Sequence, residues 1–193
     1  TAENLAEKYG ITREDSDRFA LTSQQRWAAA QKAGHFGVEI VPVTVSVKGK
    51  NVLVDTDEHP RPATTLEALA ALPAVFKRGG VVTAGNASGI NDGAAAMVLA
   101  SEDAAKNRSL RPLSRLVAYS VVGCDPAIMG IGPVPAIRKL LAKTKLSLDD
   151  IDLFDVNEAF APQWLSVAKE LNLPLEKSNV NGGAIALGHR MYT

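Results

Sequence analysis

The first 34 residues carry apolar positions at helical spacing and predict two helices. The second helix has the clearer end signals, because Thr12 is followed three residues later by Asp15, a weaker form of the capping box, and Gly34 marks its stop. Its expected inward face consists of residues spaced three or four apart: Phe19, Ser23, Trp27 and Ala30. The chain therefore opens with helices rather than with a sheet.

Alternation replaces the helical spacing at residues 41–47, where valine recurs at every second position and predicts a half-buried strand. A turn at 48–51 and a short second strand at 52–54 complete a hairpin. Thr64 and Glu67 then form a capping box that starts another helix. The leucines of that helix recur at three-residue spacing: Leu66, Leu69 and Leu72.

After residue 80 the pattern changes to apolar runs that alternate with helical segments. The runs predicted as strands are 94–100, 115–122, 151–156 and 180–185. The segments predicted as helices are 101–107, 135–143 and 161–171. Alternating strands and helices are typical of layered α/β architecture. So few strands make a poor open sheet, and we expect it to be unfinished with an exposed edge.

Charge is balanced along the chain. Lys and Arg number 21, as do Asp and Glu, so the 193 residues have a formal net charge of zero and nothing indicates nucleic acid or an anionic membrane as a partner. No apolar run reaches the ~18 residues of a membrane span, and no targeting segment is visible. Because the chain begins at Thr1 rather than Met, an upstream segment is expected.

The metal- and redox-active side chains are few. Cys124 is the one cysteine, which excludes a disulfide within this chain and a thiolate metal cluster. A single thiol fits a reducing compartment better than secretion. His35 and His59 stand alone without ligand spacing, so both are interpreted as surface loop residues and no metal site is expected.

Five short motifs follow predicted strands or precede predicted helices, where α/β folds build their sites. None is a dinucleotide fingerprint or a phosphate loop. Glycine-rich turns let a ligand approach the backbone closely, and two of the motifs also carry a polar side chain of catalytic type. The motifs are TAGNASG at 83–89, NDGA at 91–94, MGIGP at 129–133, NEAF at 157–160 and NGGAIALGH at 181–189.

In order and spacing these motifs resemble the thiolase family over residues 1–189, and within it the mitochondrial 3-oxoacyl-CoA type. The resemblance implies an α/β fold of layered αβαβα architecture, incomplete here, with a mostly helical loop domain that covers coenzyme A. On that pattern residues 1–90 are part of the loop domain, 91–111 complete the N-terminal half, and 112–193 begin the C-terminal half.

The resemblance also implies the chemistry, a reversible Claisen condensation. The expected activity is acyl transfer in fatty acid β-oxidation, in which CoA cleaves a 3-oxoacyl-CoA to acetyl-CoA and a shortened acyl-CoA. CoA is then a substrate, and no cofactor is implied. His189 matches the family histidine that takes the proton from the nucleophilic thiol and helps hold the thioester oxygen. Asn157 matches the residue that holds a water in the oxyanion hole, and Glu158 is interpreted as supporting structure.

Nine further positions match residues that contact CoA in the family. Arg61 is expected to face adenine or phosphate, Ser88 to bond the pantetheine amide, and the larger apolar side chains to line the pantetheine arm. The nine are Arg61, Leu72, Phe76, Ala84, Ala87, Ser88, Met129, Ala159 and Phe160.

Two features depart from the family pattern. The nucleophilic cysteine is expected upstream of Thr1 and the acid/base cysteine downstream of Thr193, so this chain alone is expected to be inactive. Cys124 matches a non-catalytic position and is interpreted as a buried or half-buried structural thiol. Residues 190–193 depart from the family sequence as well.

Hypotheses of different classes stay open. The chain is an interior piece of a working thiolase, whose complete form is expected to be a mitochondrial homodimer or homotetramer. Alternatively, it is a truncated, non-catalytic protein that binds CoA or pairs with a full-length thiolase. A third option, a β-ketoacyl synthase, shares the fold, but the motif at 157–160 favours a thiolase.

Overall fold

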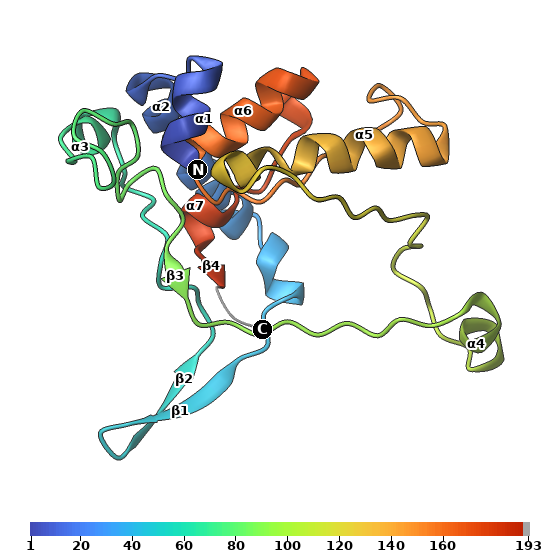
Figure 1. Ribbon diagram of the computed structural model, residues 1–193. Coiled ribbons are helices and arrows are strands. Elements are labelled where there is room, and N and C mark those ends of the chain that lie inside the picture. The colour runs from blue at the N-terminus through green and yellow to red at the C-terminus, as the bar shows by residue number, and fades with distance from the viewer. Residues whose placement is uncertain (191–193) are drawn as a thin grey trace.

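The computed structural model describes residues 1–190 and is built mainly from helices (Figure 1). The α-helices are α1 (Ala2–Tyr9), α2 (Arg13–Lys32), α3 (Leu66–Ala70), α4 (Glu102–Asn107), α5 (Pro133–Thr144), α6 (Ala161–Leu171) and α7 (Ala184–Leu187). The strands are β1 (Val43–Val47), β2 (Lys50–Val54), β3 (Ile90–Asn91) and β4 (His189–Arg190). Three short 3-10 helices are η1 (His35–Val38), η2 (Pro126–Ile131) and η3 (Leu175–Lys177).

The core forms around α6, which packs against α1 and α2 (Figure 1). Trp164 of α6 is fully buried and stacks on Phe19 of α2, with ring centroids 4.3 Å apart. Its indole Nε1–H donates to Asn179 Oδ1 at 3.4 Å, so the one polar atom of this ring is satisfied inside the core. The other large core side chains come from several elements: Leu5, Val134, Val167, Leu171 and Ile185.

The predicted start of α2 is confirmed. Thr12 Oγ1 accepts the backbone N–H of Asp15 at 3.1 Å, and Asp15 Oδ2 accepts the backbone N–H of Thr12 at 3.0 Å. Hydrogen bonds from the Thr12 hydroxyl and backbone hold the pKa of Asp15 below its usual value. The predicted inward face of α2 is buried along its length.

The cap of α3 differs from the prediction by one residue. Thr65 rather than Thr64 is the N-cap, and its hydroxyl accepts the backbone N–H of Ala68 at 3.2 Å. The Thr64 hydroxyl donates instead to the carbonyl of Arg61 at 2.7 Å, which closes the preceding turn. The predicted helices at 101–107, 135–143 and 161–171 correspond to α4, α5 and α6 and are confirmed.

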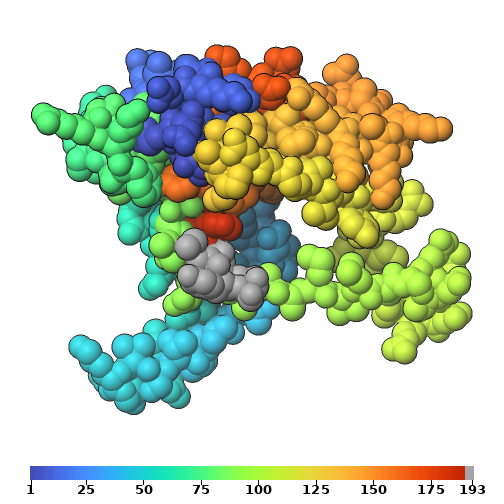
Figure 2. All heavy atoms as spheres, in the orientation of Figure 1, coloured from blue at the N-terminus to red at the C-terminus, as the bar shows by residue number. Residues whose placement is uncertain are grey.

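The hairpin forms as predicted, but the prediction that one of its faces is half-buried is wrong. Strands β1 and β2 pair antiparallel, with Val45 opposite Val52. Every residue of both strands is exposed, because the hairpin projects away from the helical body (Figures 1 and 2).

Two predicted strands are not strands. Residues 94–100 and 115–122 run as extended chain on either side of α4 and join no sheet among the described residues (Figure 1). Their apolar side chains are exposed, for example Val98 at 90 % and Leu116 at 69 %. An apolar run records a tendency to be buried, but a strand also needs a neighbouring strand to satisfy its backbone groups, and residues 1–190 offer none here.

Of the last two predicted strands, 151–156 forms one bridge and 180–185 does not form a strand. Residues 151–156 keep the alternation, with Phe154 and Val156 buried, but a single parallel bridge joins Phe154 to Ser178. Residues 180–185 are not a strand, because helix α7 begins at Ala184. The described residues therefore form two small two-stranded sheets and not the layered sheet that was expected.

Within residues 1–190, no helix is both long and apolar enough to cross a lipid bilayer.

Replacing Trp164 by alanine tests the α6-centred core. We expect Trp164→Ala to lower the free energy of unfolding by about 3–5 kcal/mol, because it empties a fully buried ring position. The control Val45→Ala in the exposed hairpin should change that free energy by about 0.5 kcal/mol or less. Urea unfolding followed by circular dichroism measures both variants. Tryptophan fluorescence is used for the hairpin control alone, because Trp164→Ala removes a tryptophan. Equal losses in the two variants would show that α6 is not the centre of the core.

Candidate functional site

Backbone hydrogen bonds bring three of the sequence motifs together. The backbone N–H and the hydroxyl of Ser88 both donate to the carbonyl of Ala159, at 3.1 and 3.0 Å. One residue further on, the carbonyl of Gly89 accepts the backbone N–H of His189 at 2.7 Å. Parallel pairing of β3 with β4 continues this contact, with Ile90 opposite His189. The 83–89 motif therefore lies between the 157–160 motif on one side and His189 on the other.

Several apolar positions expected at the CoA site lie at this junction. Ala87 forms an isolated bridge with Phe160, and the ring of Phe160 meets the ring of Phe76 edge-on, with centroids 5.9 Å apart. Phe76 is 68 % exposed, so an apolar ligand could cover it. Leu72 lies close to the α-carbon of Gly85, beside the exposed Ala84.

Arg61 lies at the surface with its guanidinium turned back over its own loop. Nη1 donates to the carbonyls of Glu58, His59 and Pro60 at 2.8, 2.7 and 3.0 Å. These bonds use one nitrogen of the guanidinium, and its other N–H groups remain for a further partner. The backbone N–H of Arg61 donates to Gln24 Oε1 at 2.8 Å, which fixes the loop against α2.

Met129 lies in η2, next to the start of α6. The carbonyl of its neighbour Gly130 accepts a hydrogen bond from Gln163 Nε2 at 3.2 Å, which holds η2 beside the first turn of α6. The side chain of Met129 is 61 % exposed. Phe160 is the residue that precedes this first turn, so Met129 and Phe160 approach α6 from the same end.

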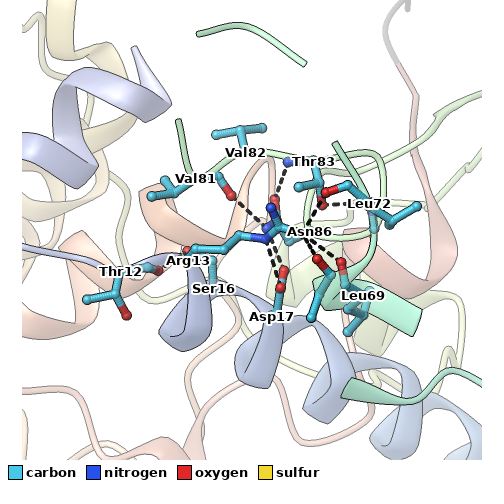
Figure 3. Close-up of polar contacts among 12 residues, drawn as sticks. Thr12, Arg13, Ser16, Asp17, Leu69, Leu72, Val81, Val82, Thr83 and Asn86 are labelled. Atoms are coloured by element: carbon cyan, nitrogen blue, oxygen red, sulfur yellow. Dashed lines mark hydrogen bonds and ion pairs between the residues drawn. The ribbon is translucent and has the colours of Figure 1, made fainter. Parts of the chain in front are cut away.

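A buried polar cluster fixes the 83–89 motif to α2 (Figure 3). Asn86 is fully buried; its Oδ1 accepts the backbone N–H of Thr83 at 2.8 Å, and its Nδ2 donates to Asp17 Oδ1 and to the carbonyl of Val81, both at 2.9 Å. Each of these polar groups has a partner, as buried polar groups require. Asn86 thereby sets the turn that carries the small residues of the motif.

Arg13 extends this cluster to the end of α3 (Figure 3). Its Nε pairs with Asp17 Oδ2 at 2.8 Å, and Nη2 donates to the carbonyls of Leu69 and Leu72 at 2.6 and 2.9 Å. These carbonyls belong to the last turn of α3 and the residues after it, where a cation is favoured by the helix dipole. One charged pair on α2 therefore orients both Leu72 and the 83–89 turn.

A second polar cluster surrounds the carboxylate of Glu158, which is 1 % exposed. It accepts the Ser23 hydroxyl at 2.6 Å, Asn179 Nδ2 at 3.0 Å and the backbone N–H of Ile185 at 3.1 Å. A Cβ on Gly183 would overlap this carboxylate, so the backbone approaches as closely as glycine alone permits. The Ser23 hydroxyl in turn accepts the backbone N–H of Gly183 at 3.1 Å.

Burial raises the pKa of Glu158 above its usual value, and the three hydrogen bonds and the nearby Asp155 charge modify that shift. The hydrogen bonds from Ser23, Ile185 and Asn179 act in the opposite direction, since they favour the ionised form, whereas Asp155 adds to the rise. A buried carboxyl with three donors is well placed to hold the 181–189 segment in one conformation.

The two residues expected to act in catalysis sit differently. Asn157 is exposed, immediately before Glu158, and it does not cap α6, whose N-cap residue is Phe160. His189 is half-buried, and its backbone N–H is held by the carbonyl of Gly89. Both residues are therefore at least partly accessible to a ligand.

Three interpretations made from single residues need correction or comment. Cys124 is exposed rather than buried, because the 115–122 segment that leads to it joins no sheet; its Sγ lies 3.6 Å from the carbonyl of Met129. His59 is half-buried rather than a surface residue, and its Nδ1 lies 2.7 Å from the carbonyl of Ala186. His35 is exposed, as expected.

The sequence placed Ser23 on the inward face of α2 and Glu158 in a supporting role, and both are buried, but it did not indicate the polar clusters that they and their partners form. Asp17, Ser23 and Gln24 lie on the buried side of α2, and a polar residue inside an apolar helical stripe is the signal that could have indicated a buried polar cluster. Asn179 and Asn86 lie in turns, where asparagine is common for local reasons, so their roles needed the structure. Within residues 1–190, no three His, Cys, Asp or Glu side chains gather as metal ligands would.

Known protein families contain close matches to this sequence. Family models match in two parts: "Thiolase, N-terminal domain" over residues 1–103 and "Thiolase, C-terminal domain" over residues 110–192. The chain belongs to the thiolase family.

Individual relatives agree with this assignment. The mouse mitochondrial 3-ketoacyl-CoA thiolase is 62 % identical over 189 residues, which are 98 % of this chain and 48 % of the relative. The crystal structure of human mitochondrial 3-ketoacyl-CoA thiolase in complex with CoA is 60 % identical with a TM-score of 0.92, over 97 % of this chain and 47 % of that one. The Bacillus anthracis acetyl-CoA acetyltransferase structure is 55 % identical with a TM-score of 0.96, over 97 % and 48 %.

The chain thus spans about half the length of the curated relatives it matches. The described residues match the fold of the corresponding part of a thiolase, and in this chain they form more helices than strands.

Glu158→Gln tests the buried carboxylate. Two hydrogen bonds to the backbone of Val156 fix the orientation of the Asn179 amide, whose Nδ2 donates to Glu158. The amide N–H of a glutamine at position 158 would then face the Nδ2–H of Asn179. We therefore expect the free energy of unfolding at pH 7 to fall by about 1–3 kcal/mol. Because the folded protein holds the Glu158 proton more tightly than the unfolded chain, its stability should fall as pH rises from about 4.3 through the raised pKa of Glu158 and then level off.

Urea unfolding at a series of pH values measures both effects. The pH-dependent fall should be absent from Glu158→Gln and present in the control Glu14→Gln, whose carboxylate is exposed on α2. An unchanged fall in Glu158→Gln would mean that another group is responsible.

Proposed function

We propose that the protein containing these residues is an acyltransferase that uses CoA to cleave a 3-oxoacyl-CoA into acetyl-CoA and a shortened acyl-CoA. The observation that carries the proposal is the junction of the 83–89, 157–160 and 181–189 motifs around His189, in a chain of the thiolase family. Fatty acid β-oxidation is the process in which this cleavage would serve.

His189 would act as the base that takes the proton from a nucleophilic cysteine thiol. Supporting this role, the backbone of His189 is fixed by Gly89, and a ring nitrogen of an imidazole can accept a proton. The thiolate then attacks the 3-oxo carbonyl, and the bond between the α- and β-carbons breaks as acetyl-CoA takes up a proton. We expect the cysteines for these steps to lie outside residues 1–193, as in the family pattern.

Asn157 would hold a water that donates a hydrogen bond to the thioester oxygen. Its support is its position: it is exposed, and it precedes the buried Glu158 that holds the His189 segment. Attack of CoA on the acyl-cysteine thioester would then release the shortened acyl-CoA and regenerate the thiol.

CoA would lie along the exposed side of the junction. Ser88 and the carbonyl of Ala159 would face the pantetheine amide, with Ala84 and Ala87 leaving room for it. The apolar side chains of Leu72, Phe76, Met129 and Phe160 would cover the arm, and Arg61 would use its remaining N–H groups on adenine or phosphate. The human relative crystallised with CoA supports the choice of ligand.

We extend the proposal to organisation and location. Residues 1–90 would belong to a loop domain over CoA, 91–111 would complete the N-terminal half and 112–193 would begin the C-terminal half of a homodimeric or homotetrameric enzyme. We propose a mitochondrial location because the mouse and human relatives carry that word in their names. Bacterial relatives are 54–56 % identical, so subcellular fractionation is the test of location.

His189→Ala in the intact protein tests the proposed function. We expect CoA-dependent release of acetyl-CoA from a 3-oxoacyl-CoA to fall by about 10²–10⁴-fold, because the general base is lost. Mass spectrometry of the acyl-CoA products measures the rate. The control His35→Ala, at an exposed histidine of η1, should stay within about twofold of the unsubstituted protein. Equal activity in the two variants would contradict the role given to His189.

A non-catalytic CoA binder is the second candidate, and the observation behind it is the exposed ring of Phe76 against Phe160, which CoA could cover without any reaction. The two candidates differ in the native protein isolated with an antibody to residues 1–34. A mass near twice 20.4 kDa with thiolysis activity supports the enzyme. A mass of 20.4 kDa without thiolysis supports the binder.

A further inference from the structure

His59 touches both of the segments that hold His189 in place. Its Nδ1 lies 2.7 Å from the carbonyl of Ala186, in α7. A carbonyl can only accept, so Nδ1 must carry the hydrogen and donate it, which fixes the ring tautomer and orientation. This bond reaches from the loop before α3 to a residue 127 positions later in the chain.

The same ring packs against Gly89, whose carbonyl binds the backbone of His189. A Cβ added to Gly89 would overlap the His59 imidazole, so the ring lies directly on the Gly89 backbone. The carbonyl of Gly89 accepts the backbone N–H of His189 at 2.7 Å. His59 thus contacts one residue three positions before His189 and one residue that hydrogen-bonds His189 directly.

The loop that carries His59 is itself anchored. Gln24 is buried on α2 and accepts the backbone N–H of Arg61 at 2.8 Å, while its Nε2 lies 3.5 Å from the carbonyl of Ile185. Pro60, between His59 and Arg61, is buried as well. The 59–61 loop and the 185–186 segment are therefore tied to the same side chain of α2, and His59 bridges them at a fixed separation.

We infer that His59 is a positioning residue: its Nδ1–H···O=C bond to Ala186, together with its packing on Gly89, holds the turn from which His189 projects. This inference rests on the proposed function for the catalytic role of His189, but the positioning itself does not require it. His59 contacts Ala186 and Gly89, so its effect would pass through the backbone of residues 186–189.

Three variants separate the hydrogen bond from the bulk of the ring. His59→Asn places an amide N–H close to the position of Nδ1 and keeps a donor for Ala186. His59→Phe keeps a flat ring on Gly89 and removes the donor. His35→Phe makes the same change at an exposed histidine whose Nδ1 lies 3.3 Å from Asn181 Oδ1, earlier in the same glycine-rich segment.

Hydrogen–deuterium exchange of the 193-residue chain is the first measurement. We expect His59→Phe to speed exchange in residues 186–189 by about fivefold, with His59→Asn and His35→Phe within about twofold of the unsubstituted chain. Unchanged exchange in residues 13–32 checks that the variant keeps its fold. Equal exchange in 186–189 for His59→Phe and the unsubstituted chain, or an equal acceleration in His59→Asn, would overturn the inference.

Thiolysis by the intact protein is the second measurement. His59→Phe should lower kcat by roughly tenfold with the KM for CoA within about twofold, and His59→Asn should restore kcat. A rise in KM with unchanged kcat would overturn the positioning role. An intact unsubstituted protein with no thiolysis would instead refute the proposed function, and the exchange comparison would still decide whether His59 holds the turn.

Discussion

The carboxylate of Glu158 lies where α2, the segment around Asn179 and the start of α7 meet, and its burial obliges each of them to supply a donor. A buried carboxylate is tolerated when such partners are present, and removal of one leaves a costly unsatisfied group. Because Ile185 lies four residues before His189, the requirement extends to the backbone that carries the expected catalytic histidine. Stability and site geometry therefore depend on the same three hydrogen bonds.

The cluster of Asp17 and Asn86 follows the same principle and lies earlier on α2, since Asp17 precedes Ser23 in that helix. The carboxylate of Asp17 forms an ion pair with Arg13 and accepts a hydrogen bond from Asn86. Through these two residues it fixes the end of α3 and the 83–89 turn. Helix α2 thus serves as a common base for segments that are far apart in the sequence (Figures 1 and 3). Ala87 and Ser88, which pair with Phe160 and Ala159, are thereby fixed to α2 as well.

Much of the helical part could be predicted from sequence, because its signals are local. The Thr12 cap and the stripe from Phe19 to Ala30 depend on residues within a few turns of each other. The predictions of strands at 94–100 and 115–122 were wrong, because a strand forms only beside a neighbouring strand and the local sequence pattern does not show whether one is present. The site motifs were found as short polar and glycine-rich segments beside predicted elements, and the family resemblance supplied their roles. The bond from His59 to Ala186 joins a loop to α7 across 127 residues, and no local sequence pattern indicates it.

CoA is proposed to bind one surface that segments anchored on α2 form around Ser88 and Phe160. The decisive experiment is hydrogen–deuterium exchange of the 193-residue chain with and without saturating CoA. We expect slower exchange with CoA in residues 59–61, 84–91 and 159–161, and no change in the exposed hairpin formed by β1 and β2. CoA-dependent protection confined to other residues, or no protection at any concentration, would rule out this surface.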